Sequence, residues 1–254
     1  MKTLIIIPTY NEIENIKKLV TEVFHHVDSN THILICDDNS PDGTGDLADV
    51  LAETNQRVHV IHRPRKMGLG TAYVTGFRYA LDNGYDVIFE MDSDFSHDPK
   101  YLPLFQQEIE KYDAVIGSRY VAGGGVLNWG FGRRILSKGG SIYARMLLGM
   151  PFQDLTGGFN CWRRSILEAI GPNNLKSDGY AFQIEIKYKA HKMGFRMKEI
   201  PIVFEDRYLG QSKMNKKIVV EAMYRVLLMR FQEGGPPKML SESQHSHSNM
   251  NRPS

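Results

Sequence analysis

The stretch VIFEMDSD, residues 87–94, places two aspartates directly after a short and mostly apolar run. The run Val87–Met91 is typical of a buried strand. Asp92 and Asp94 then fall at the carboxyl end of that strand, which is where open parallel sheets bind their ligands. Carboxylate oxygens are the ligands that Mg²⁺ and Mn²⁺ prefer. Turn-forming residues follow at 96–99, so the triplet alone could equally cap a helix.

The rest of the first half alternates strand and helix patterns around this stretch. Strands are predicted at Leu4–Ile7, His32–Cys36 and Val58–Ile61, and helices at Asn15–His26, Leu47–Glu53 and Gly70–Asn83. This alternation predicts an α/β fold with a Rossmann-like, mostly parallel central sheet and helices on both faces. The polar segments Thr9–Glu12 and Asp37–Asp38 follow two of these strands, so we expect them on the same sheet edge as Asp92.

The second half of the chain is less regular. Strands are predicted at residues 114–117 and 197–203, and helices at residues 133–148, 165–170, 181–193 and 218–231. The glycines at 123–125 predict a loop that is mobile or tightly turned. From Glu233 the chain is rich in Ser, His, Asn and Pro, which predicts disorder. We therefore expect one catalytic domain over residues 1–232 and a disordered tail over residues 233–254.

Composition and charge exclude several classes of protein. The 254 residues carry 31 basic and 29 acidic side chains, a net charge of +2, which gives no reason to expect nucleic acid as a partner. Two distant cysteines, Cys36 and Cys161, form no disulfide framework and favour a reducing compartment. The apolar run at Leu4–Ile7 is too short for a signal peptide, and no segment approaches the ~20 apolar residues that span a bilayer. We expect a soluble or peripheral protein.

The segments PTYNE (8–12) and DDNSPDGT (37–44) indicate a nucleotide site. Pro-Asp-Gly within the second segment is a turn signal. Two adjacent acids repel one another unless something binds there, and a carboxylate can accept hydrogen bonds from a nucleobase or ribose. Tyr10 supplies a ring that can pack on a base, and Glu12 supplies an acid for the ribose. The alternative interpretation is an ordinary turn and helix cap.

Seven segments occur in an order typical of one enzyme family: PTYNE, DDNSPDGT, GLGTAY, MDSDFSHDP, GSRY, DLTGGF and DRYLGQSK. Over residues 1–231 the chain resembles the dolichol- or polyprenol-phosphate mannosyltransferases of glycosyltransferase family 2. The resemblance implies an A-type glycosyltransferase fold. It also implies transfer of mannose from GDP-mannose to a polyisoprenyl phosphate, with inversion to a β-linked product and with Mg²⁺ or Mn²⁺ as cofactor.

The resemblance further implies roles for single residues. Donor contacts are implied for Pro8, Tyr10, Glu12, Cys36, Asp38, Asp92, Ser93, Arg207 and Lys213. Metal ligation is implied for Asp92 and Asp94, with Asp94 the more direct, and for Ser96, where some relatives carry glutamine, a better ligand. Acceptor-phosphate contacts are implied for Arg119, Arg133 and Ser137. Asp94 and Arg119 are thus the implied catalytic residues.

The chemistry agrees with these roles. An arginine fork suits a phosphate, and a phosphate acceptor is already anionic, so no strong general base or Ser-His-Asp arrangement is required. The histidines, including His97, are interpreted as surface, turn or tail residues.

Two basic amphipathic segments, residues 133–148 and 216–231, are expected to lie in a membrane interface. In the second, Val219, Val220, Met223, Val226 and Leu227 form one apolar stripe, flanked by Lys216, Lys217, Arg225 and Arg230. The alternative is a core helix with a solvated face. A lipid acceptor favours the first interpretation and a peripheral position on the cytoplasmic face of a membrane. Small membrane-anchoring subunits are further partners that the sequence leaves open.

Three other functions compete with mannosyl transfer. A polyprenol-phosphate glucosyltransferase would use UDP-glucose, and such relatives often carry two transmembrane helices that are not found here. A non-catalytic nucleotide-sugar-binding subunit need not keep both Asp94 and Arg119. A nucleotidyltransferase would carry a glycine-rich, basic loop where PTYNE stands.

Overall fold

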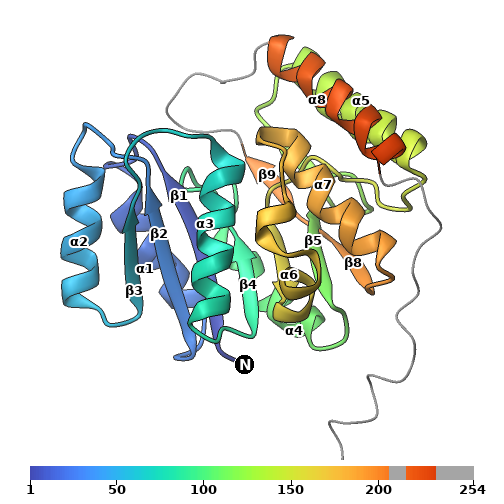
Figure 1. Ribbon diagram of the computed structural model, residues 1–254. Coiled ribbons are helices and arrows are strands. Elements are labelled where there is room, and N and C mark those ends of the chain that lie inside the picture. Colours follow the sequence, from blue (N-terminus) through green and yellow to red (C-terminus); the bar gives the residue numbers. More distant parts are fainter. Residues whose placement is uncertain (206–215, 233–254) are drawn as a thin grey trace, which may run out of the picture.

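A seven-stranded sheet forms the centre of the computed structural model, which describes residues 1–205 and 216–232 (Figure 1). The strand order is β3-β2-β1-β4-β7-β5-β8. Its members are β1 (Thr3–Thr9), β2 (Thr31–Asp37), β3 (Val58–His62), β4 (Val87–Glu90), β5 (Ala114–Ser118), β7 (Asn160–Arg163) and β8 (Met197–Pro201). Every pairing is parallel except those of β7, which runs antiparallel to both β4 and β5. The predicted mostly parallel sheet is confirmed.

Helices cover both faces of the sheet, as predicted. One face packs against α1 (Ile16–His26), α2 (Thr44–Thr54) and α4 (Leu102–Ile109), and the other against α3 (Leu69–Asp82), α6 (Arg164–Ile170) and α7 (Gly179–Lys192). In β1, Ile5 and Ile7 point to the first face and Leu4 and Ile6 to the second. A Cβ atom on Gly76 would lie 2.6 Å from Cγ2 of Ile6, so glycine lets α3 pack directly on β1.

The second half departs from the sequence-based expectation in its strands. The antiparallel strand β7 and the helix α4 were not predicted. The single strand expected over 197–203 is broken at Ile202, whose N–H bonds Ser118 and whose carbonyl accepts from Gly125. Beyond this break, β9 (Val203–Glu205) pairs with β6 (Gly125–Leu127) in a small second sheet. The glycine loop before β6 is tightly turned, because a Cβ on Gly124 would lie 2.5 Å from the carbonyl oxygen of Ser118.

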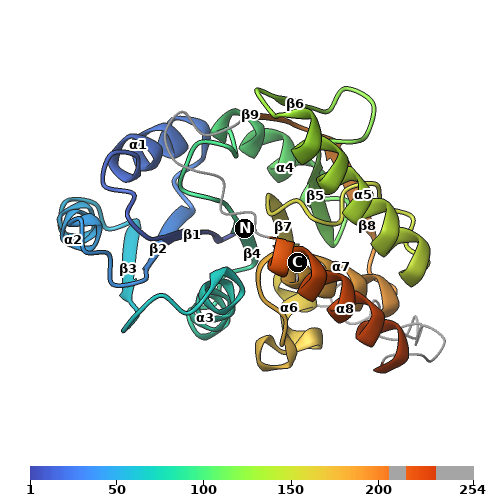
Figure 2. The same cartoon turned by 90° about the horizontal axis from the view of Figure 1, so that it is seen from above.

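Two further helices, α5 (Phe131–Leu148) and α8 (Lys216–Gln232), lie side by side as an outer helix pair (Figures 1 and 2). They pack on α7 through a third apolar cluster that includes Ala144, Leu148, Ile184, Tyr188, Val226 and Met229. The pair lies beyond the sheet edge at which β1, β2 and β4 end. The expected C-terminal helix is therefore present. The predicted tail, residues 233–254, lies outside the described residues.

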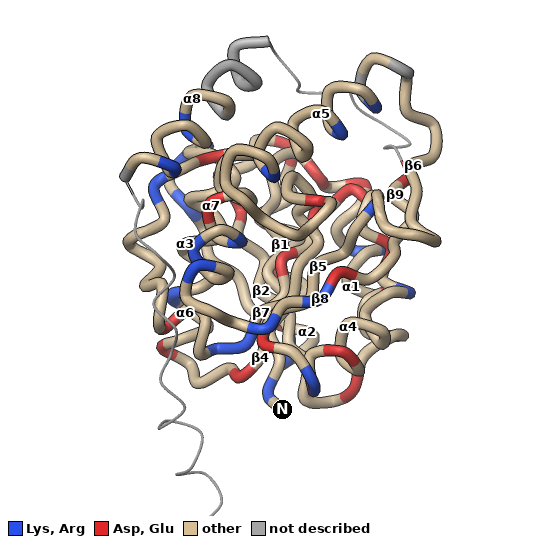
Figure 3. Tube along the Cα trace, turned by 90° about the vertical axis from the view of Figure 1, so that its right-hand side faces the viewer, with Lys and Arg blue, Asp and Glu red and all other residues tan. Residues whose placement is uncertain are grey.

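The outer helix pair also leaves large apolar side chains exposed. Met146 is 78% exposed and Phe231 is 76% exposed, and Ile135, Ile142, Tyr224 and Leu227 are exposed as well. Exposed lysines and arginines accompany them on the same two helices, among them Lys138, Arg145, Arg225 and Arg230 (Figure 3). In the described part of α8, Val226 and Met229 are buried in the third cluster and Met223 and Leu227 are exposed, so the predicted apolar stripe is partly core. The place of this helix at a membrane interface stays a prediction. None of the described helices has the length and apolar character needed to cross a bilayer.

Candidate active site

A pocket of about 190 Å³ opens at the carboxyl ends of β1, β2 and β4. It is lined by Pro8, Thr9, Tyr10, Glu12, Asp38, Lys66, Gly68, Leu69, Ala72, Asp92, Ser93 and Asp94. We call it the acidic pocket, because four of these side chains are carboxylates. The strand order explains it, since β1 lies between β2 and β4 and their loops meet at one edge. The structure thus brings together Pro8, Tyr10, Glu12, Asp38 and the Asp92–Asp94 triplet, as expected.

The Asp92–Asp94 triplet forms a tight turn over a buried histidine. Phe95 has a left-handed backbone (φ 63°), and Oδ1 of Asp94 accepts from the backbone N–H of Ser96 at 3.1 Å. The backbone N–H of Asp92 donates to Nδ1 of His97 at 2.9 Å. The His97 ring is buried and stacks on Phe159 at 4.9 Å between centroids. His97 is thus a turn residue, one of the predicted alternatives, but it is buried rather than on the surface, and its ring supports the Asp92–Asp94 turn.

Tyr73, from the GLGTAY segment, orients the Asp92 carboxylate. Its hydroxyl donates to Oδ1 of Asp92 at 3.2 Å. The ring is fully buried, and this burial raises the pKa of Tyr73 well above its usual value, so the phenol remains a donor. The GLGTAY segment is one of the seven family motifs, but nothing in the sequence linked Tyr73 to Asp92.

Glu90 lies two residues before the triplet, in a buried polar network. Its carboxylate accepts from Nε1 of Trp162 at 2.9 Å, Nε2 of Gln183 at 2.6 Å and Nδ2 of Asn160 at 3.3 Å. Burial raises the pKa of Glu90 to about 7, although these hydrogen bonds oppose the shift. The network fixes β4 against β7 and α7, and so fixes the strand end that carries Asp92.

The acidic pocket fits a divalent cation that shares its ligands with a substrate. Asp92 and Asp94 both line the pocket, and Oγ of Ser96 is buried without a hydrogen-bond partner. Over residues 1–205 and 216–232 no group of three or more His, Cys, Asp or Glu side chains is arranged to hold a metal. Mg²⁺ is commonly held by one or two carboxylates together with substrate phosphates, so two aspartates suffice here.

The adjacent acids Asp37 and Asp38 both have partners within the protein. Asp37 accepts from Oγ1 of Thr9 at 3.0 Å and from Oγ of Ser40 at 2.6 Å. Asp38 forms an ion pair with the buried Arg63, with 3.1 Å between Nε and Oδ1. Burial raises the pKa of Asp38, and Arg63 opposes that shift. These contacts offset the repulsion between the two acids without a bound ligand. Asp38 also lines the acidic pocket, and ligand binding by Asp38 stays a prediction.

Cys36, the remaining implied donor contact on β2, is completely buried within the strand, and its side chain does not line the acidic pocket. Burial raises the pKa of its thiol to about 12.

Arg119 follows β5 and is held by a buried aspartate from the DLTGGF segment. Its Nε and Nη2 each donate to Asp154 at 2.7 Å, and Nη2 also donates to Oγ1 of Thr156 at 2.9 Å. Burial alone would raise the pKa of Asp154, but the Arg119 guanidinium holds it below its usual range. Lys187, also buried, donates to the carbonyl of Gly157 at 2.7 Å and so supports the same loop. Neither Asp154 nor Lys187 was predicted to have a role.

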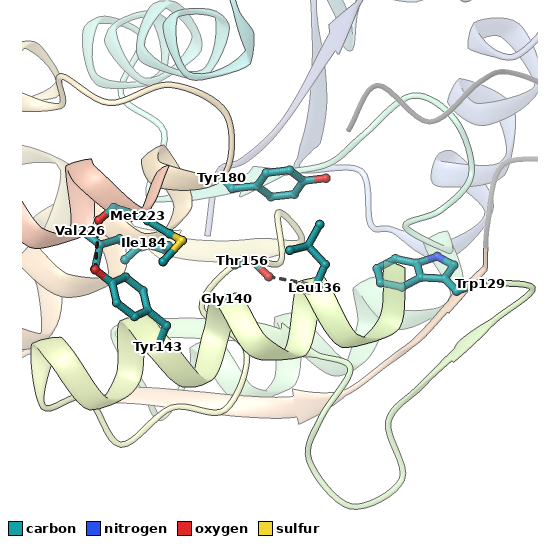
Figure 4. Close-up of a pocket in the computed structure, with 10 residues that line it drawn as sticks. Trp129, Leu136, Gly140, Tyr143, Thr156, Tyr180, Ile184, Met223 and Val226 are labelled. Carbon is teal, nitrogen blue, oxygen red and sulfur yellow. Dashed lines mark hydrogen bonds between the residues drawn. The ribbon is translucent and has the colours of Figure 1, made fainter. Parts of the chain in front are cut away.

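A second, mostly apolar pocket of about 60 Å³ lies against the outer helix pair (Figure 4). It is lined by Trp129, Leu136, Ser137, Gly140, Tyr143, Thr156, Tyr180, Ile184, Met223 and Val226. Oγ of Ser137 lies 3.5 Å from Oγ1 of Thr156, which in turn bonds Arg119. Ser137 and Arg119 are thus brought together through one threonine, at the polar side of this apolar pocket.

The other implied phosphate contacts cannot be placed in the same way. Arg133 lies in α5, but its side chain is outside the described part of the structure, and Arg207 and Lys213 fall in the undescribed segment 206–215.

The model of one protein family, Glycosyl transferase family 2, matches residues 4–171. The chain belongs to glycosyltransferase family 2. A relative from Mycolicibacterium smegmatis, named polyprenol monophosphomannose synthase, is 48% identical over 89% of this chain and 85% of its own length. A second, the undecaprenyl-phosphate mannosyltransferase of Micrococcus luteus, is 45% identical over 89% of this chain and 93% of its own length.

Solved structures share the fold at much lower identity. A mannosyltransferase from Pyrobaculum calidifontis in complex with GDP-Man and Mn²⁺ superposes with a TM-score of 0.62 at 17% identity, over 93% of this chain and 66% of that one. Glucosyl-3-phosphoglycerate synthase from Mycobacterium tuberculosis gives a TM-score of 0.66 at 15% identity, over 89% of this chain and 79% of that one. The A-type glycosyltransferase fold expected from the family 2 motifs is therefore confirmed.

Proposed function

We propose that this family 2 enzyme transfers mannose from GDP-mannose to a polyisoprenyl phosphate and releases polyprenyl phosphate β-D-mannose. The names of the two relatives above, which match most of the chain, support this assignment. The observation that carries it is a pair of unlike pockets. One is acidic and suits a nucleotide with its cation. The other is mostly apolar and is lined by Ser137 and by Thr156, which accepts a hydrogen bond from Arg119 behind it.

The acidic pocket is assigned to the donor. Asp92 and Asp94 would hold the diphosphate through Mg²⁺ or Mn²⁺, whose charge stabilises the departing GDP. Asp38 would contact the nucleoside, because it follows β2, which β1 separates from β4. Tyr10 follows β1, between the two, and would pack on the base. Tyr73 and His97 keep the triplet in place while the donor binds. Arg207 and Lys213 remain sequence-based predictions for the phosphates.

The apolar pocket is assigned to the first part of the prenyl chain, with the acceptor phosphate beside Arg119. The bonds to Asp154 and Thr156 use Nε and Nη2 of Arg119, so a phosphate would take the N–H groups of Nη1. A phosphate oxygen then bonds to C1 of mannose while the bond from C1 to the GDP oxygen breaks. This single displacement inverts the anomeric carbon and needs no protein nucleophile.

The outer helix pair is assigned to the membrane surface. Its exposed apolar side chains, such as Met146 and Phe231, can enter the interface, and its exposed arginines and lysines can face anionic headgroups. A polyprenyl chain lying in the bilayer would then reach the apolar pocket between these helices. We place the protein peripherally on the cytoplasmic face, where its two free, buried cysteines stay reduced.

A panel of donors and acceptors tests the assignment. GDP-mannose and UDP-glucose are each combined with a short-chain polyprenyl phosphate and Mg²⁺ or Mn²⁺, and the product's anomeric configuration is determined by NMR. We expect transfer from GDP-mannose and a β-linked product. A preference for UDP-glucose would identify a glucosyltransferase instead, an α-linked product would reject single displacement, and no transfer with any pair would favour a non-catalytic subunit.

A further inference from the structure

Lys66 is the single basic side chain among the described residues that line the acidic pocket. Its Nζ lies 4.0 Å from the centroid of the Tyr10 ring. No motif or implied role in the sequence includes it. The charged side chains that line the pocket are otherwise four carboxylates. An ammonium group beside an aromatic ring is there a donor of hydrogen bonds next to a surface on which a flat ligand can stack.

The loop that carries Lys66 is anchored on both sides. The backbone N–H of Arg63 donates to the carbonyl of Asp37 at 2.7 Å, and Nη2 of Arg63 donates to Oγ1 of Thr71 at 2.6 Å. After Lys66, the backbone of Met67 hydrogen-bonds Asp38 and favours its charged form. The position of Lys66 beside Asp38 is therefore set by the fold, even though its side chain is exposed.

The strand order places Lys66 at the nucleobase end of the pocket. Asp38 follows β2, the loop of Lys66 follows β3, and the Asp92–Asp94 triplet follows β4. Neighbouring strands are about 4.8 Å apart, so β2 and β3 lie about 10 Å and about 14 Å from β4. A nucleoside diphosphate whose phosphates lie at the triplet therefore directs its base toward Asp38 and Lys66.

We propose that Lys66 is a specificity-determining residue that donates a hydrogen bond to O6 of guanine, while Oδ2 of Asp38, the oxygen not paired with Arg63, accepts from the N1–H group. Guanine presents acceptors at O6 and N7, whereas adenine presents an amino donor in place of O6. An ammonium group has donors only, so it favours guanine and opposes adenine. Tyr10 supplies the surface on which the base stacks. The inference rests on the proposed function, in which the donor is a GDP-sugar.

The substitution Lys66→Met tests this, with GDP, IDP and ADP titrated calorimetrically in the presence of Mn²⁺. GDP and IDP share O6 and should each bind about 10-fold more weakly to the variant, the loss expected for one charge-assisted hydrogen bond. ADP lacks O6 and should bind equally well or better. Arg65→Met removes an exposed positive charge one residue away and serves as the matched control, for which all three affinities should stay near wild type.

Each contrary result has a distinct meaning. Equal weakening of GDP, IDP and ADP would place Lys66 on the phosphates and overturn base recognition. Unchanged GDP binding by the Lys66→Met variant would show that Lys66 does not contact the donor. A wild-type protein that does not prefer GDP to ADP would instead contradict the proposed function itself, before any variant is made.

Discussion

Asp154→Asn removes the negative partner of Arg119 while keeping the size of the side chain. Asp154 is completely buried and the Arg119 side chain is 4% exposed, so water cannot replace the lost partner. Both carboxylate oxygens bond the guanidinium at 2.7 Å, and the carboxylate also accepts the backbone N–H groups of Arg119 and Gly157 at 3.0 Å. Breaking a buried pair on one side typically costs about 3–5 kcal/mol of unfolding free energy.

Thermal and urea unfolding measure this loss. For a chain of this size 1 kcal/mol shifts Tm by about 2–4 °C, so we expect Tm to fall by roughly 6–20 °C. The matched control is Glu168→Gln, which breaks an exposed pair with Arg164 that is just as short, 2.6 Å. Exposed pairs contribute at most about 1 kcal/mol, so this control should unfold near the wild-type temperature.

A double variant separates stability from activity. Arg119→Met combined with Asp154→Leu replaces both charges by apolar groups and should recover part of the stability. The recovery is incomplete because the backbone N–H groups of Arg119 and Gly157 lose their acceptor. Mannosyl transfer should remain lost, because no guanidinium is left for the acceptor phosphate. An Asp154→Asn protein within about 1 kcal/mol of wild type would refute the burial argument, and an active double variant would remove Arg119 from the acceptor site.

Three further results are expected. Asp94→Ala should lower transfer by at least ~100-fold, because several kcal/mol of charge stabilisation are lost with the metal, and full activity in excess EDTA would contradict this. Tyr73→Phe removes the hydroxyl that orients Asp92 and should raise the Mn²⁺ concentration for half-maximal transfer by about 10-fold, with Tyr79→Phe, on the same helix, as the control. The chain alone should float with anionic liposomes at low salt and less at high salt, and Met146→Glu with Phe231→Glu should abolish flotation. A protein that stays in solution with such vesicles would contradict the interfacial role.

The first half of the fold could be predicted because its signals are local. A parallel strand that is buried on both faces reads as a continuous apolar run, as Leu4–Ile7 does. Strand β7 gave no such signal, since Asn160 and Arg163 look like loop residues. Asn160 is accommodated in a buried strand because Glu90 and Gln183, both distant in sequence, accept hydrogen bonds from its Nδ2. Helix α4 was missed because eight residues show too little periodicity.

The residues of the candidate active site were also predicted only in part. Tyr10, Asp38, Asp92 and Asp94 were predicted to meet because each follows a strand whose carboxyl end lies on one sheet edge. The supporting residues were not predicted, since their roles exist only in the folded chain. Tyr73 reaches Asp92 across 19 residues and Asp154 reaches Arg119 across 35, and the motifs that contain them do not specify these partners.

The antiparallel strand β7 also separates the central sheet into two parts. The strands beneath the acidic pocket are contiguous in the chain, from Thr3 to Glu90, whereas the strands beyond β7 begin at Ala114. In the sheet, these two parts join through the β4–β7 ladder, from the pair Val87–Arg163 to the pair Glu90–Asn160. A chimera with its crossover between residues 99 and 113 must preserve that ladder, the contacts of Glu90 and the packing of α3 against α6 and α7. Such a chimera would join the proposed donor pocket of one family 2 enzyme to the proposed acceptor pocket of another.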